Sequence, residues 1–183
     1  MKIVPVTAFP TAARVAAHRK MQDLLSWEIV KVRADEESGQ PLVLSFPHRV
    51  LWISIRDLRE HRPLAAAAEL RAWRFLVMSG NRVAAAVQAW NDRGTWRVSS
   101  IHTGVTATRT VEALKAADNR VNAQAEPCYI WCRAAWTAAL WLRPLDGKAG
   151  AVVKLPGTAP SSEDDFMANL RKRVEARQPW PVT

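Results

Sequence analysis

The chain contains few cysteines and few glycines, and it has no long hydrophobic run. Two cysteines among 183 residues are too few for a disulfide-stapled scaffold. The seven glycines are scattered, without the GxGxxG or P-loop spacing that cradles a nucleotide phosphate. No stretch approaches the roughly 18 consecutive apolar residues of a transmembrane helix, so the sequence predicts no transmembrane segment.

The spacing of the two cysteines, Cys128 and Cys132, does not favour a covalent or metal link. In a strand, this spacing corresponds to roughly 13 Å, which is too far for a disulfide. On a helix the two residues would be neighbours, but a CxxxC pair needs two further ligands to hold zinc. We therefore expect two buried free thiols.

The chain also lacks the histidine spacings of helical metal sites. Its four histidines are His18, His48, His61 and His102. None of them forms an HxxxH or HExxH pair, and the acidic cluster 163–165 is explained as the first turn of a helix. We therefore expect no metal and no cofactor.

The overall composition is that of a folded protein. Hydrophobic residues make up 49% of the chain and charged residues 23%, so we expect one globular domain over residues 1–183, with a Pro/Trp tail at 178–183. Residues 1–10 contain no sustained apolar run, which argues against a signal peptide. The location expected from these features is cytoplasmic.

Basic residues and tryptophan are abundant. Lys and Arg number 26 against 17 Asp and Glu, for a formal net charge of +9, which points to nucleic acid, an anionic membrane or an acidic protein as a partner. Arginine outnumbers lysine 19 to 7, a bias typical of a GC-rich bacterial genome. The nine tryptophans are roughly four times ordinary usage, and each indole must be buried, stacked on a partner or left exposed.

The amino-terminal part of the chain predicts both helices and strands. A helix should begin at Thr11, because apolar residues recur there on one stripe. Pro47 should end a strand, because proline cannot donate to a ladder, and Pro63 should start a helix. Strands are predicted at 27–33, 42–46 and 50–55, and a helix at 64–73.

Residues 74–101 carry the clearest local pattern. Strands at 74–79, 82–90 and 95–101 are separated by tight turns, each of which contains Gly together with Asn or Asp. These segments predict a three-stranded meander. The amphipathic pattern after Gly104 predicts a helix.

The carboxyl-terminal part is less uniform. Residues 128–142 are apolar at every even position, which favours a long or bent strand, with a buried helix as the alternative. A strand follows at 151–155. A last helix is predicted after Ser161 or Ser162, with acidic residues in its first turn and basic residues toward its end.

The order of these elements predicts an α+β protein. Its mainly antiparallel sheet would consist of the three-stranded meander at 74–101 and flanking strands, packed by three to four helices. An α+β roll, in which one helix packs across a curved antiparallel sheet, is the alternative. No motif identifies a family.

Arginines and tryptophans are the candidate binding residues. Two basic clusters at 49–62 and 171–177 predict either a phosphate-binding surface or a solvated face with internal ion pairs. Trp90 is a candidate for exposure or for packing in a second layer, whereas Trp27, Trp73, Trp96 and Trp136 are expected to face the core. The partner-binding candidates are Arg49, Trp52, Arg56, Arg59, Arg62, Trp90, Arg171, Lys172, Arg173, Arg177 and Trp180.

Three functional hypotheses follow. The leading one is a small bacterial adaptor, inhibitor or immunity-type module, without enzymatic activity, that binds an acidic protein surface through Trp and Arg. The first alternative is a nucleic-acid-binding protein that uses the clusters at 49–62 and 171–177. The second alternative is a hydrolase or transferase with His102 and Cys128 in its site. The sequence specifies neither an identified partner nor an oligomeric state.

Overall fold

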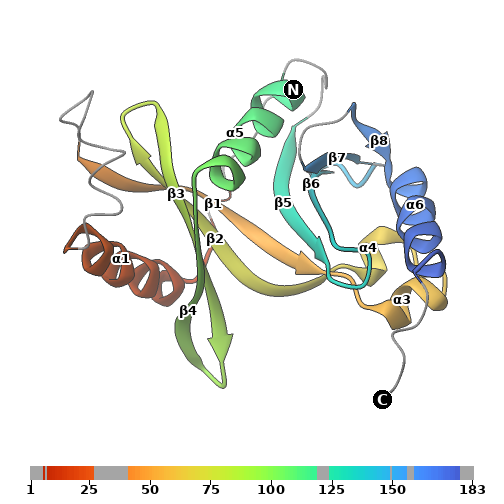
Figure 1. The fold of residues 1–183 in the computed structure, drawn as a ribbon, viewed down its shortest axis with the longest axis horizontal. Helices are drawn as coiled ribbons and strands as arrows, with labels where there is room; N and C mark the ends of the chain where they lie inside the picture. The colour runs from red at the N-terminus through yellow and green to blue at the C-terminus, as the bar shows by residue number, and fades with distance from the viewer. Residues whose placement is uncertain are drawn as a thin grey trace.

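Figure 1 shows the computed structural model of the chain, which describes residue 6 and the ranges 8–26, 41–118, 124–148, 150–155 and 159–177. The described helices are α1 (Thr11–Ser26), α3 (Ile55–Arg59), α4 (Leu64–Ala67), α5 (Val105–Asp118) and α6 (Glu163–Glu175). The strands are β1 (Leu42–Trp52), β2 (Glu69–Ser79), β3 (Arg82–Asp92), β4 (Thr95–Thr103), β5 (Ala125–Cys132), β6 (Thr137–Pro144), β7 (Ala151–Leu155) and β8 (Ser161–Ser162). The predicted strand at 27–33 and the tail at 178–183 lie outside the described residues.

The eight strands form one sheet in the order β4-β3-β2-β1-β5-β6-β7-β8. Neighbouring strands are antiparallel, except that β1 and β5 pair in parallel at the centre. The sheet thus consists of two four-stranded halves joined by one parallel pair (Figure 1).

The predicted fold class is wrong. The framework is an eight-stranded mixed sheet, not a three-stranded meander at 74–101 with flanking strands. The hairpins have turn signals in the local sequence, so their strands are recognisable. The parallel pair instead joins distant residues, such as Arg49 and Cys128, and no local pattern marks such a pairing.

Helices cover the two faces of the sheet unequally, and we name the faces after them. On the α6 face, α1 packs on Trp73 and Phe75 in one half, while α6, α3 and α4 pack on the other half. On the α5 face, α5 packs on Leu76 and Ala86 of one half and on Leu140 of the other. Among the described helices α5 alone covers this face (Figure 1), so part of the α5 face is left without a helical layer.

Several helices begin and pack as the sequence predicts. In α1, Ala13, Ala17 and Met21 are buried on one stripe, as expected for residues spaced four apart on a helix. In α6, the Ser162 side chain caps the helix by accepting a hydrogen bond from the Asp165 N–H at 3.1 Å. The predicted helix after Gly104 and the predicted strand at 151–155 are confirmed as α5 and β7.

Strand β1 continues through Pro47, where a break was predicted between strands at 42–46 and 50–55. Phe46 has a φ of 47°, and the pairing with β2 changes register between Ser45 and His48. This bulge removes Pro47 from the ladder, so its missing N–H interrupts no inter-strand hydrogen bond.

The predicted helix at 64–73 is wrong beyond its first turn. The helix α4 ends at Ala67, and β2 begins at Glu69. Alanine-rich composition favours a helix locally, but burial of Trp73 in the sheet outweighs that preference.

Residues 128–142 form neither a long strand nor a helix. They form most of the hairpin β5-β6, whose turn spans residues 133–136. Trp136 has a φ of 46°, and its N–H donates to the Arg133 carbonyl at 3.1 Å. The turn contains no Gly, Pro, Asn or Asp, so the usual turn signals are missing.

Candidate functional site

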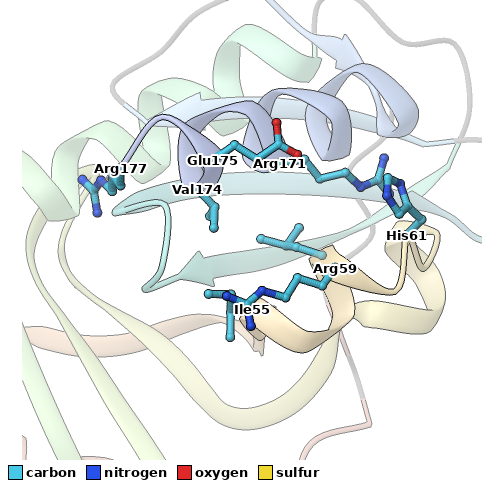
Figure 2. A pocket seen from close by; sticks show the side chains of 8 residues that line it. Ile55, Arg59, His61, Arg171, Val174, Glu175 and Arg177 are labelled. Atoms are coloured by element: carbon cyan, nitrogen blue, oxygen red, sulfur yellow. The ribbon is translucent and has the colours of Figure 1, made fainter. Parts of the chain in front are cut away.

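Parts of the two predicted basic clusters come together at one end of the sheet. Helix α3 carries Arg56 and Arg59 of the first cluster, and α6, which contacts α3, carries Arg171, Lys172 and Arg173 of the second. Between them lies a cavity of about 580 Å³, shown in Figure 2. In this view the Arg59 side chain of α3 runs toward Ile55, the Arg171 side chain of α6 extends toward His61, and Arg177 lies at the opposite end from Arg171.

A second cavity, of about 660 Å³, adjoins the first. The two cavities share the lining residues Ile55, Val174 and Arg177, so they adjoin. We call the two cavities together the α3–α6 surface. Its aromatic and charged lining residues are Trp52, Arg59, His61, Glu69, Arg71, Arg133, Trp136, Arg171, Glu175 and Arg177.

A capping box begins α3 and positions the Asp57 carboxylate, which accepts a hydrogen bond from Arg62. The Ser54 hydroxyl accepts a hydrogen bond from the Asp57 N–H at 3.2 Å, and the Asp57 carboxylate accepts one from the Ser54 N–H at 3.3 Å. The hydrogen bond from Ser54 lowers the pKa of Asp57, and a further bond from Arg62 acts in the same direction. Asp57 is therefore ionised at neutral pH and can neutralise Arg62.

Some arginines near this surface are neutralised by carboxylates. Arg56 pairs with Glu60 at 2.6 Å and Arg62 pairs with Asp57 at 2.8 Å. Arg71 pairs with Glu69 at 2.6 Å. Arg56 and Arg62, two of the predicted binding residues, and the neighbouring Arg71 therefore add less net positive charge to the surface than the sequence indicates.

Other arginines keep their charge. Arg59 and Arg133 are exposed, and neither has an ion pair among the described residues. Arg171 and Arg177 donate to backbone carbonyls, those of Arg62 and Ala134, at 3.3 and 3.2 Å. A carbonyl positions a guanidinium without cancelling its charge, so these four arginines make the surface electropositive.

Two tryptophans border the same surface. Trp52, at the end of β1, is 46% exposed, and Trp136, in the β5-β6 turn, is 66% exposed. Trp136 also packs edge-to-face on Trp131, with ring centroids 6.2 Å apart. The prediction that Trp136 faces the core is wrong, because the turn at 133–136 carries its indole out of the sheet.

The other predicted binding residues lie elsewhere or have structural contacts. Arg49 lies on the α6 face, where it pairs with Glu126 at 2.9 Å and stacks 5.7 Å from the Trp73 ring centroid. Arg173 donates to the Thr137 hydroxyl at 3.3 Å, and Lys172 is exposed on α6.

The remaining tryptophan candidates are not part of the α3–α6 surface. Trp90 is 44% exposed on the α5 face of β3. Trp180 lies outside the described residues.

The structure separates His102 from Cys128. His102 lies on β4 and pairs with the Ser100 hydroxyl at 3.0 Å on the α5 face, whereas Cys128 is buried on β5 in the cluster beneath α6. Strands β3, β2 and β1 lie between them. Burial, followed by the nearby Glu126 carboxylate, raises the pKa of Cys128 to about 12. The thiol therefore lacks both the histidine and the ionisation that a nucleophile requires.

Neither a metal cluster nor a membrane helix is found in the part of the chain that the structure describes. Its His, Cys, Asp and Glu side chains form no group of three or more that could hold a metal ion. None of its helices is long and apolar enough to cross a membrane.

Comparison with protein-family models, with curated proteins and with solved structures finds no significant match, so the site has to be interpreted from its own chemistry.

Proposed function

We propose that this protein is an interaction module that binds an acidic segment of a partner protein on the α3–α6 surface. One observation carries the proposal. Arginines from four separate parts of the chain, namely α3, β2, the β5-β6 turn and α6, line two adjoining cavities beside two exposed tryptophans.

The composition of this surface matches that of protein-binding hot spots. Arginine and tryptophan are enriched at such positions, because both combine a large contact area with directed hydrogen bonds. Trp52 and Trp136 supply the apolar area, and Arg59 and Arg133 supply charge that no described carboxylate neutralises. The formal net charge of +9 would additionally speed the approach of an acidic partner.

The carboxylates at the same surface favour a protein over a nucleic acid. Glu69 and Glu175 line the α3–α6 surface. Asp57, within α3, and Glu60, at the end of α3, lie beside this surface. A nucleic acid presents negative charge at every phosphate and would be repelled by these groups. A protein segment carries acidic side chains at only some positions, so it can place apolar and polar side chains beside these carboxylates and acidic side chains beside the arginines.

The experiment is a fluorescence-anisotropy titration of a labelled peptide that interleaves Glu and Asp with Leu and Phe. The test variant is Arg59→Glu/Arg177→Glu. The control variant is Arg19→Glu/Arg97→Glu, which makes the same change in net charge at exposed residues of α1 and β4. Matching the charge change separates a local contact from the field of the whole molecule.

We expect the test variant to weaken peptide binding by about tenfold or more, since charge reversal at an interface costs more than 1.4 kcal/mol in typical cases. The control should have a clearly smaller effect. Equal weakening by both variants, or no saturable binding by the parent protein, would contradict the proposal.

A single-stranded oligonucleotide of the same net charge provides the second arm of this titration. We expect it to bind more weakly than the peptide at physiological salt. Tighter oligonucleotide binding that falls steeply with salt and is weakened by Arg59→Glu/Arg177→Glu would replace the protein partner with a nucleic acid.

A further inference from the structure

A smaller cavity, which shares only Trp52 with the described lining of the α3–α6 surface, lies on the part of the α5 face that no described helix covers. Its volume is about 280 Å³, and it spans five adjacent strands, from β4 to β5. The described residues that line it are Val50, Trp52, Arg74, Gln88, Ser100, His102, Tyr129 and Trp131. The strand register accounts for this group, because His48 and Val50 lie opposite Arg74 and Ala72, and Gln88 lies opposite both Arg74 and Ser100.

Arg74 is the buried cation of this cavity. It is 2% exposed, and its guanidinium carbon lies 3.6 Å from the centroid of the Tyr129 ring. Its Nη2 donates to the Gln88 side-chain oxygen at 3.2 Å, whereas its Nε and Nη1 have no hydrogen-bond partner among the described residues. A guanidinium carries five N–H donors, so most of the donor capacity of Arg74 is unused.

No carboxylate among the described residues forms an ion pair with Arg74. Among the described lining residues of the cavity, none is acidic. Glu126, the buried carboxylate of β5, lies on the α6 face and pairs with Arg49. A buried charge without a counter-ion is unfavourable, and an anion that enters the cavity would relieve that cost.

The histidines near Arg74 add no second positive charge at neutral pH. Burial, followed by the charge of Arg74, lowers the pKa of His48 to about 3. The same two causes lower the pKa of His102. Arginine keeps its proton at neutral pH, so the group carries a single positive charge and matches a monoanion better than a doubly charged phosphate ester.

We propose that the cavity binds the carboxylate of a small ligand with an aromatic or aliphatic body, and that Arg74 is the residue that receives the carboxylate. Trp52, Trp131 and Val50 form apolar walls for the body of the ligand. Gln88, Ser100 and His102 lie toward the β4 side of the cavity and offer polar contacts. A volume of about 280 Å³ suits a free carboxylic acid or the last residue of a peptide chain.

This site does not depend on the proposed partner surface. The two share Trp52 alone among the described residues that line them. Arg74 does not line the α3–α6 surface, and neither Arg59 nor Arg177 lines the cavity. Variants at these arginines therefore test the two proposals separately.

The first experiment needs no variant. Isothermal titration calorimetry compares 3-phenylpropionate with 3-phenylpropionamide, which has the same body but no charge. We expect the acid to bind about tenfold or more tightly than the amide, because hydrogen bonds to a charged group contribute more than neutral ones. Inorganic phosphate should bind more weakly than the acid. Equal affinities of acid and amide, or tighter binding of phosphate, would overturn the proposal.

A second arm identifies the source of the carboxylate. An acetylated tripeptide that ends in Phe is titrated with a free and with an amidated carboxyl terminus. Preference for the free terminus supports a peptide end as ligand, and preference for 3-phenylpropionate alone supports a small molecule. If neither 3-phenylpropionate nor the tripeptide with a free carboxyl terminus binds, the proposed site is overturned.

Two variants then locate the binding. Arg74→Met replaces the guanidinium with an apolar side chain, and Arg97→Met removes an exposed arginine from β4 as the matched control. We expect Arg74→Met to lose at least about tenfold in affinity for the acid while Arg97→Met keeps the parent value. Circular dichroism verifies that each variant is folded. A folded Arg74→Met protein that binds the acid as tightly as the parent would overturn the assignment of Arg74.

Discussion

His48 and Arg74 are adjacent ionisable residues, paired across β1 and β2 and both buried. The His48 Nδ1–H donates to the Phe46 carbonyl at 2.8 Å, and its Nε2 has no hydrogen-bond partner among the described residues. Burial and the charge of Arg74 together keep the imidazole neutral, with a pKa of about 3 against 6.5 in an exposed histidine. The folded protein thus resists a proton that the unfolded chain accepts.

This difference predicts that acid weakens the fold through His48. Above pH 6.5 His48 is neutral in both states and the free energy of unfolding keeps its full value. As pH falls from 6.5 toward 3, only the unfolded chain takes up the proton, so the free energy of unfolding decreases by about 1.4 kcal/mol per pH unit. Urea unfolding at pH 7 and pH 5, followed by tryptophan fluorescence, measures it. Between pH 7 and pH 5 we expect the free energy of unfolding of the parent protein to fall by about 2 kcal/mol more than that of the His48→Gln variant. Identical losses in both proteins would contradict the account of His48.

The two cysteines predict a negative result with thiol reagents. Cys128 and Cys132 are fully buried, and burial raises the pKa of both thiols, that of Cys128 to about 12. On the order of one Cys128 thiol in 10,000 is ionised at pH 8. We expect no reaction with Ellman's reagent within minutes in the folded protein and two thiols after unfolding in guanidinium. Rapid reaction of either thiol in the folded state would contradict their placement.

At the scale of single elements, sequence patterns succeed where the cause is local. The helix at Thr11, the cap at Ser162 and the turns with Gly80 and Gly94 each depend on residues within a few positions of one another. The pairing of β1 with β5 depends on distant residues, and the turn at 133–136 depends on tertiary packing without a turn residue. These are the features that the sequence did not predict.

The candidate site shows the same division. The clusters at 49–62 and 171–177 are visible in the sequence, and α3 and α6 bring parts of them together. Arg49 belongs to the first cluster in sequence only, because strand alternation turns it toward Glu126 on the α6 face. Arg133 and Trp136 escaped prediction because the turn that exposes them has no recognisable signal.

Arg74 was missed although a signal was present. It is a charged residue between Trp73 and Phe75 in a strand that is otherwise mostly apolar up to Met78. Alternation places it opposite these two aromatic residues, on the face with Ala72 and Leu76. That pattern indicates a buried arginine but not the Tyr129 ring or the uncovered cavity beside it.

The start of α6 is fixed to the sheet through Gly150. The Glu163 carboxylate accepts hydrogen bonds from the Gly150 N–H at 2.7 Å and the Trp141 indole at 2.8 Å. A Cβ at Gly150 would lie 2.6 Å from the Leu142 carbonyl oxygen and 2.6 Å from the indole nitrogen. There is therefore no room for a methyl group between β6 and α6.

We predict that Gly150→Ala lowers the free energy of unfolding by about 2 kcal/mol or more, because backbone or Glu163 must move. Gly147→Ala is the matched control, since it has open space and a φ of 74° and should cost about 1 kcal/mol through backbone strain. Chemical unfolding of the three proteins measures the difference. A cost at Gly150 no larger than that at Gly147 would contradict this packing.

At the scale of the whole molecule, the two halves of the sheet share a core. Leu51 and Ile53, from β1 and its end, pack in one cluster with Cys128 and Ile130 of β5. On the other face, Val50 and Ala72 pack with Tyr129. Separating the halves would expose both clusters.

This shared core predicts that the chain unfolds as one unit, in keeping with the single domain expected from its length. In differential scanning calorimetry we expect one transition with calorimetric and van't Hoff enthalpies that agree. Two resolved transitions, or a van't Hoff enthalpy well below the calorimetric one, would instead indicate that the four-stranded halves unfold separately.

The measurement that tests the central claim most directly is a titration of ¹⁵N-labelled protein with the acidic peptide, followed by the shifts of assigned amide and indole signals. We predict that the largest shifts fall on α3, on the turn at 133–136 and on the end of α6, together with the indole signals of Trp52 and Trp136. Shifts confined to α1 or to the β3-β4 hairpin, or no shifts at saturating peptide, would contradict the assignment of the α3–α6 surface as the binding site.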